Sequence, residues 1–140
     1  MKLSKKITAF ALGLTFISSS AYAKCDQKAS YLNQRGSTLE LCYHNGHDNY
    51  TGNLSGTFTS AVGNCKADMN KKMPISGVFN YNAVAIAINF SNCGQVVAMT
   101  GTIAGDELHT IWLDAAKTDD AIVKNWNSNV VGADYYKKVK

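Results

Sequence analysis

Apolar and polar side chains alternate with a period of two residues through much of this chain, and this alternation limits its fold more than any other feature. Residues 77–81 and 84–90 are rich in β-branched and aromatic side chains. Such segments are typical of β-strands with one buried face. Small or polar residues interrupt the pattern at regular intervals, and the pair Asn45-Gly46 is a strong hairpin signal because both residues tolerate positive φ. The sequence therefore predicts an all-β protein.

Eight strands are expected, joined by short turns. Their predicted ranges are 28–34, 37–44, 50–60, 74–81, 84–91, 95–103, 108–115 and 128–137, and only residues 119–127 are expected to form a helix, of one or two turns. The single proline, Pro74, is placed at the start of its strand, where the missing N–H does least harm. Short connections favour an eight-stranded antiparallel up-and-down β-barrel, because closure removes exposed strand edges. Such a barrel has room for one small ligand. A two-sheet sandwich is the alternative fold.

The first 23 residues are expected to be a secretory signal peptide. Lys2, Lys5 and Lys6 precede an apolar run at 7–17, and Ala21-Tyr22-Ala23 fits an A-x-A cleavage site. The apolar run is too short to span a bilayer, which disfavours the alternative of a signal anchor. We therefore expect a single domain over residues 24–140, in a secreted or periplasmic protein.

Charge argues against a nucleic-acid or membrane partner for that domain. The signal segment carries three of the 14 Lys and Arg residues and none of the 10 Asp and Glu residues, so 11 basic and 10 acidic residues remain. The one basic cluster left is the tail at 137–140, which a solvated terminus explains. No nucleic-acid partner is expected, and no membrane partner after signal removal.

All four cysteines, Cys25, Cys42, Cys65 and Cys93, lie in the exported part. An even number of cysteines in an oxidising compartment favours two disulfides, for which three pairings are possible. The sequence has no C-x-x-C, and the spacing matches no zinc pattern. We therefore predict no metal site.

An enzyme is the alternative class of function. The candidate acids and bases are His44, His47, His109, Asp106, Asp114 and Asp134. No nucleophile elbow, phosphate loop or H-E-x-x-H motif accompanies them. His44 and His47 flank the Asn45-Gly46 turn and are expected to be solvated loop residues, and His109 is expected to face outward. The sequence therefore favours a protein that is not an enzyme.

Several stretches, in order and at matching spacing, carry a family resemblance. They are Asn33-Gln34-Arg35-Gly36-Ser37-Thr38, residues 56–64 (Gly-Thr-Phe-Thr-Ser-Ala-Val-Gly-Asn), Thr110-Ile111-Trp112-Leu113, Trp126, Val131-Gly132-Ala133-Asp134-Tyr135 and Lys138-Val139-Lys140. Over about residues 30–140 the chain resembles the avidin–streptavidin family of biotin-binding proteins. The resemblance implies a barrel that holds biotin in its mouth, without a cofactor and without catalysis.

The resemblance also implies roles for individual residues toward the cyclic urea of biotin. Asn33 and Ser37 match donors to the urea oxygen, while Phe58 stands where the best-known members have a tyrosine and so cannot donate. Ser60 and Asp134 match acceptors for the two urea N–H groups, and a carboxylate there would form a charge-assisted hydrogen bond.

The rest of the predicted site surrounds the apolar body and the carboxylate of biotin. Its members are Trp112, Phe90 and Met99 as walls, Val62 and Asn64 in the ligand-gating loop, and Gln95 and Val97 where the family usually has a serine and a threonine. Trp126 matches a tryptophan that reaches into the pocket of a neighbouring subunit, which implies a homodimer or a homotetramer. These departures leave one alternative open, a barrel with weakened biotin binding that carries a different small ligand, as lipocalin-like barrels do.

The resemblance extends to the cysteines. Cys65 and Cys93 resemble the disulfide of the short dimeric, rhizavidin-type avidins, where it braces the mouth of the pocket. That pairing leaves Cys25 for Cys42, which the first hairpin could bring together across adjacent strands.

Overall fold

The structure, a computed structural model, describes residues 24–63, 65–117 and 129–139. The predicted signal peptide, the predicted helix at 119–127, Asn64 and Trp126 lie outside these residues.

Eight strands follow one another along the described chain. They are β1 (Gln27–Asn33), β2 (Thr38–Asn45), β3 (Thr51–Thr59), β4 (Lys72–Asn80), β5 (Ala83–Phe90), β6 (Gln95–Ala104), β7 (Glu107–Ala116) and β8 (Asn129–Lys138). Each predicted strand is present, and its ends fall within two residues of the prediction. The all-β prediction is therefore confirmed.

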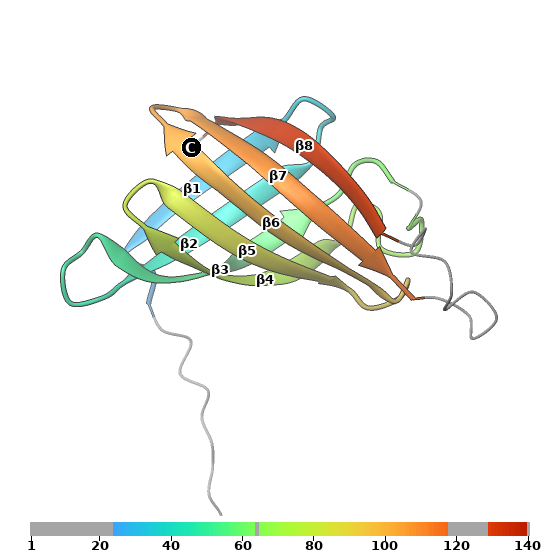
Figure 1. The fold of residues 1–140 in the computed structure, drawn as a ribbon, viewed down its shortest axis with the longest axis horizontal. Helices are drawn as coiled ribbons and strands as arrows, with labels where there is room; N and C mark the ends of the chain where they lie inside the picture. Colours follow the sequence, from blue (N-terminus) through green and yellow to red (C-terminus); the bar gives the residue numbers. More distant parts are fainter. Residues whose placement is uncertain (1–23, 64, 118–128, 140) are drawn as a thin grey trace, which may run out of the picture.

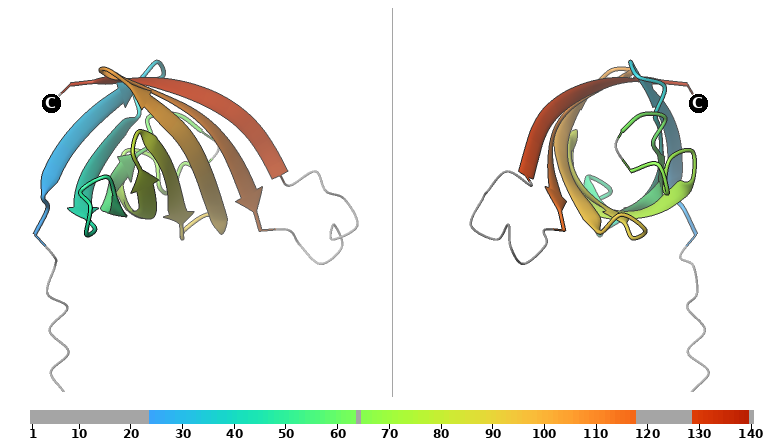
Figure 2. Two further views of the ribbon diagram at one scale, coloured as in Figure 1. Left: turned by 60° about the vertical axis from the view of Figure 1, so that its left-hand side comes forward. Right: turned by 90° about the vertical axis from the view of Figure 1, so that its right-hand side faces the viewer.

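The strands form one closed antiparallel barrel in sequence order, with β8 returning to pair with β1. Closure is made by Tyr31 opposite Lys138 and by Asn33 opposite Tyr136. The strands cross the molecule obliquely, and the end-on view shows them as a ring (Figures 1 and 2). The up-and-down barrel is confirmed, and the sandwich alternative is wrong.

Alternation along each strand fills the barrel with apolar side chains. In β5 the inward positions are Val84, Ile86, Ile88 and Phe90, all buried, and the residues between them are more exposed. Adjacent strand residues point to opposite faces of a sheet, so this pattern directs one side chain in two to the interior. Apolar burial of this kind is the main favourable term in folding.

The turn after β2 differs from its prediction. β2 ends at Asn45 and β3 begins at Thr51, so the connection is longer than the two-residue turn that Asn45-Gly46 favours. Asn49, not Asn45 or Gly46, takes the positive φ of 58°. The Asp48 carboxylate holds the turn by accepting hydrogen bonds from the Tyr50 and Thr51 backbone N–H groups, each at 3.0 Å. An aspartate that caps neighbouring N–H groups explains why the turn forms here.

Pro74 also lies differently from its predicted place. It is the third residue of β4, opposite Thr57, because pairing with β3 continues through Met73 and Lys72.

Both predicted disulfides are present. Cys25–Cys42 ties the segment before β1 to β2, and Cys65–Cys93 ties the connection between β3 and β4 to the turn between β5 and β6. That β3–β4 connection, drawn in green, curves across one opening of the ring (Figure 2). We call this opening the mouth of the barrel. Within the described residues, no helix has the length and apolar character needed to cross a membrane.

Candidate functional site

A cavity of about 360 Å³ lies inside the barrel at its mouth. It brings together eleven of the twelve residues that the sequence predicts for the ligand site within one chain: Asn33, Ser37, Phe58, Ser60, Val62, Phe90, Gln95, Val97, Met99, Trp112 and Asp134. The twelfth, Asn64, lies outside the described residues, as does Trp126. Residues from six strands and two connections thus converge on one space.

Asn33 and Ser37 flank the turn between β1 and β2, and the backbone orients both side chains. The Asn33 Oδ1 accepts hydrogen bonds from the backbone N–H groups of Arg35, at 3.0 Å, and Ser37, at 2.8 Å. Gly36 makes the turn possible, since its φ of +87° suits glycine. With Oδ1 occupied, the Asn33 side-chain NH₂ is left to donate into the cavity.

The hydroxyl of Ser37 is arranged in the same way. Its Oγ accepts a hydrogen bond from the backbone N–H of Ala61 at 3.0 Å, which leaves its O–H as a donor. Ser37 and Asn33 are only 2% and 6% exposed. The two side chains therefore offer two buried donors side by side.

Asp134, on β8, is an acidic group of the cavity. Its Oδ2 accepts a hydrogen bond from Trp112 Nε1 at 3.1 Å, and its Oδ1 accepts one from Gln34 Nε2 at 2.7 Å. Arg35 Nε lies 3.7 Å from Oδ1. Each carboxylate oxygen can accept two hydrogen bonds, so Asp134 keeps accepting capacity for a ligand N–H.

Ser60 directly follows β3, where the connection to β4 begins. Its hydroxyl donates to the backbone carbonyl of Val62, so its own oxygen lone pairs are left to accept a hydrogen bond. Among these four predicted residues, Asn33 and Ser37 thus offer donors and Asp134 and Ser60 offer acceptors.

Apolar side chains form the walls between these polar groups. Phe58 and Phe90 pack edge to face with their ring centroids 6.1 Å apart, and Met99 lies opposite Trp112 on the neighbouring strand. Trp112 itself packs over Gly132, where an added Cβ would come within 2.2 Å of the indole ring. A slot with aromatic walls and few polar groups suits a small, largely apolar ligand.

An aspartate that was not predicted for the site lies near the end of β7. Asp114 lines the cavity, and its Oδ2 accepts a long hydrogen bond, 3.4 Å, from Gln95 Nε2. Its Oδ1 is buried without a hydrogen-bond partner among the described residues. Burial raises the pKa of Asp114 above the usual value for an aspartate. A negative charge here is therefore poorly compensated.

Other lining residues were also missed from the sequence. They are Arg35, Gly63, Cys65, Ile88, Val130 and Tyr136. The signal for Tyr136 was available: it follows Asp134 by two residues on the same strand, and such residues share a face. Ile88 lies two residues before Phe90 on β5, so the same alternation predicts that its side chain also faces inward.

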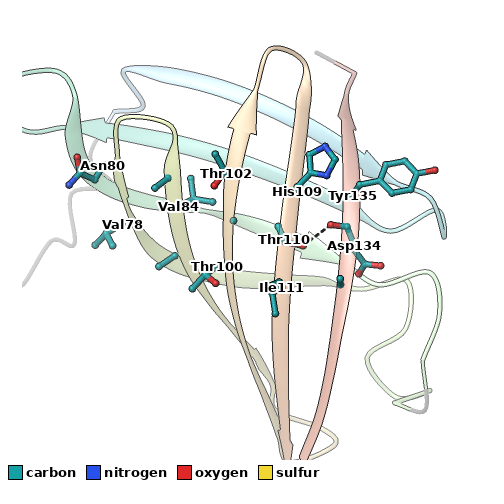
Figure 3. A pocket seen from close by; sticks show the side chains of 14 residues that line it. Val78, Asn80, Val84, Thr100, Thr102, His109, Thr110, Ile111, Asp134 and Tyr135 are labelled. Carbon is teal, nitrogen blue, oxygen red and sulfur yellow. Dashed lines mark hydrogen bonds between the residues drawn. The ribbon is translucent and has the colours of Figure 1, made fainter.

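A second depression, of about 840 Å³, lies over the outer surface of β4 to β8 (Figure 3). Exposed side chains of Thr100, Thr102, His109, Ile111 and Tyr135 line it. His109 faces outward as predicted and lies 3.1 Å from Glu107 Oε2, at the surface.

His44 and the cysteines have other partners in the part of the chain that the structure describes. His44 is not the solvated loop residue that was predicted: it lies on β2, partly buried, with Nε2 2.8 Å from Ser55 Oγ, because β2 extends past it to Asn45. Cys65, Asp68 and Cys93 lie close enough together to hold a metal ion, but the two sulfurs are bonded to each other.

The comparison with protein families decides the identity of the fold. The model of the Avidin family matches residues 21–139. This chain belongs to the avidin family. Avidin family proteins bind their ligands without chemical conversion, so the prediction that the protein is not an enzyme is confirmed.

Solved avidin structures agree with this assignment. Core-bradavidin has 23% sequence identity and a TM-score of 0.66, over 80% of this chain and 99% of that one. The bradavidin2–biotin complex has 25% identity and a TM-score of 0.62, with coverage of 80% and 96%. Apo shwanavidin has 20% identity and a TM-score of 0.66, with coverage of 80% and 95%. No curated protein sequence matches the chain.

Proposed function

We propose that this avidin binds biotin in the cavity at the mouth of its barrel, as a secreted, non-catalytic binding protein. The observation that carries the proposal is the orientation of four polar side chains, Asn33, Ser37, Ser60 and Asp134. Two keep a donor free and two keep an acceptor free. A cyclic urea needs donors at its oxygen and acceptors at its two N–H groups.

The apolar walls support the same ligand. Trp112, Phe90 and Met99 leave a slot for the thioether ring and its chain. Bradavidin2, at 25% identity, was solved as a complex with biotin. A carrier of lipids would have little use for four polar groups in its cavity, two of them buried, because each must be satisfied by the ligand or lose free energy.

Calorimetric titration of the oxidised protein with biotin tests the proposal, with desthiobiotin as a competitor. We expect saturation at one biotin per chain with nanomolar or tighter affinity. Asn33→Ala is the site variant, and Asn53→Ala, on the outward face of β3, is its matched control. Millimolar or absent binding to the wild-type protein would overturn the biotin proposal.

One observation favours the second candidate, a different but related ligand. Asp114 places a poorly compensated carboxylate in the cavity near the end of β7. The free carboxylate of biotin would be repelled there, whereas the neutral amide of biotin would not. Titration with biotin and with biotin amide separates the two candidates: the amide binds several-fold more tightly if Asp114 faces the tail of the ligand, and equally if it does not.

We also propose that the protein self-associates as a homodimer or a homotetramer, in which Trp126 of one subunit completes the cavity of another. Support comes from an exposed apolar band on the outside of β7 and β8, formed by Ile111, Leu113 and Val131. Sedimentation of wild-type protein and of Leu113→Glu tests this, with Asn53→Glu on β3 as a control. A monomeric wild-type protein would contradict the proposal.

Export of the protein is the final part of the proposal. Residues 1–23 act as the signal peptide and residues 24–140 form the secreted or periplasmic domain. N-terminal sequencing of the exported protein should begin at Lys24, and a chain that retains Met1 would contradict it.

A further inference from the structure

Tyr136 places a phenol hydroxyl in the interior of the barrel. It lies on β8, is fully buried and lines the cavity at the mouth. Its hydroxyl is buried and meets no hydrogen-bond geometry among the described residues, although its oxygen interacts with the Asn33 side chain across the barrel seam. Buried polar groups almost always find a partner in a native protein. A buried hydroxyl proton without an acceptor, on a residue that lines a ligand cavity, therefore points to an acceptor that arrives with the ligand.

The register places this hydroxyl beside the donors already described. Tyr136 is directly opposite Asn33 in the pairing that closes the barrel, and it shares the inward face of β8 with Asp134. Phe58, which lacks a hydroxyl, lines the same cavity. A third donor at this place would converge with Asn33 and Ser37 on one acceptor atom.

The hydroxyl is able to donate at any ordinary pH. Burial, and then the negative charge of Asp134, raise the pKa of Tyr136, and these effects outweigh the opposing influence of Asn33 and Arg35. The phenol is therefore protonated throughout the neutral range. A neutral phenol is both a donor and an acceptor, whereas a phenolate could only accept.

We propose that the Tyr136 hydroxyl donates the third hydrogen bond to the urea oxygen of the bound ligand, in place of the hydroxyl that Phe58 lacks. The inference rests on the proposed biotin function and adds a residue that determines specificity for a carbonyl oxygen. Hydrogen bonding by the ligand would also give the buried Tyr136 hydroxyl proton an acceptor, which the described residues do not provide.

Tyr136→Phe tests the proposal because it removes only the oxygen. We expect biotin and desthiobiotin, which share the urea, to bind more weakly by a factor on the order of ten. The melting temperature of the ligand-free protein should be unchanged or higher, because the lost hydroxyl proton had no acceptor among the described residues. Tyr135→Phe, on the adjacent outward-facing residue, is the matched control and should bind like the wild type.

A second variant moves the hydroxyl across the cavity. Phe58→Tyr combined with Tyr136→Phe should regain the affinity that Tyr136→Phe alone loses. Equal affinity of wild type and Tyr136→Phe for biotin overturns this inference and leaves the biotin function intact. A lower melting temperature with unchanged affinity assigns the hydroxyl to the fold and also overturns it. Absence of biotin binding in the wild type overturns the function and the inference together.

Discussion

The Asp68 carboxylate accepts two hydrogen bonds from Asn92. One oxygen accepts the Asn92 backbone N–H at 3.1 Å, and the other accepts the Asn92 side-chain amide. Asp68 is fully buried in the β3–β4 connection, and Asn92 is in the β5–β6 turn. The Cys65–Cys93 disulfide joins the same two segments. The connection that curves across the mouth is thus fixed to the barrel twice, once covalently and once by a buried carboxylate.

Removal of that carboxylate should loosen the mouth. We expect Asp68→Ala to lower the free energy of unfolding by roughly 2–3 kcal/mol, because it removes two hydrogen bonds that a buried carboxylate accepts. Urea unfolding with the disulfides intact measures the change. Asp106→Ala, at an exposed turn, is the control, and equal midpoints for the two variants would show that the Asp68 pairing contributes little.

The two disulfides should differ in their effect on binding. Each closes a loop, of 17 and 28 residues in sequence separation, and loss of either should cost about 3–4 kcal/mol of stability by the chain-entropy estimate. Replacement of Cys65 and Cys93 by serine should also speed biotin dissociation, since a free connection must be ordered on binding. Replacement of Cys25 and Cys42 should leave dissociation unchanged. Stopped-flow displacement measures both, and equal dissociation rates would contradict the bracing role.

Asp114 should make stability depend on pH. Its pKa is raised in the folded protein, so its protonated form favours folding: this contribution is complete below the unfolded pKa and is lost as the pH rises through the folded pKa. Asp114→Asn should therefore be more stable than the wild type at pH 7, and the difference should vanish in acid. Denaturation midpoints at both pH values provide the measurement. A constant difference across pH would mean that the carboxylate is not penalised by burial.

Gly132 should be intolerant of any side chain. A Cβ at this position would overlap the Trp112 indole, whose Nε1 donates to Asp134. Gly132→Ala should displace the ring, alter the near-UV circular dichroism and weaken biotin binding tenfold or more. Ala133→Ser adds an atom at the neighbouring exposed residue and serves as the control. An unchanged aromatic signal in Gly132→Ala would show that the indole accommodates the methyl group.

The strands could be predicted closely because their signal is local. In β5, apolar and small residues alternate so regularly that the inward face can be read directly from residues 84–90. The turn after β2 was placed correctly, but its geometry was not, because the capping carboxylate of Asp48 outweighs the preference of Asn45-Gly46.

The candidate site was predicted through family resemblance more than through residue patterns. Asp68 illustrates the limit: it lies in an irregular connection, and its partner is 24 residues away, so no local pattern reveals the pair. Tyr136 could have been found, because its place two residues after Asp134 sets its direction. The family resemblance assigns the third position at the urea oxygen to Phe58 and implies no role for Tyr136.

The seam between β1 and β8 also bears on when the protein becomes able to bind. Asn33 lies on one side of this seam and Asp134 on the other, so the urea would span two strands at opposite ends of the sequence order. Both synthesis and the proposed export deliver β8 after the other seven strands. The emerging chain can pair its hairpins one by one, yet it has no complete site until the seam closes. Binding of the proposed ligand would therefore require the closed barrel. The bound urea would contact both strands of the seam that pairs last and so stabilise that pairing.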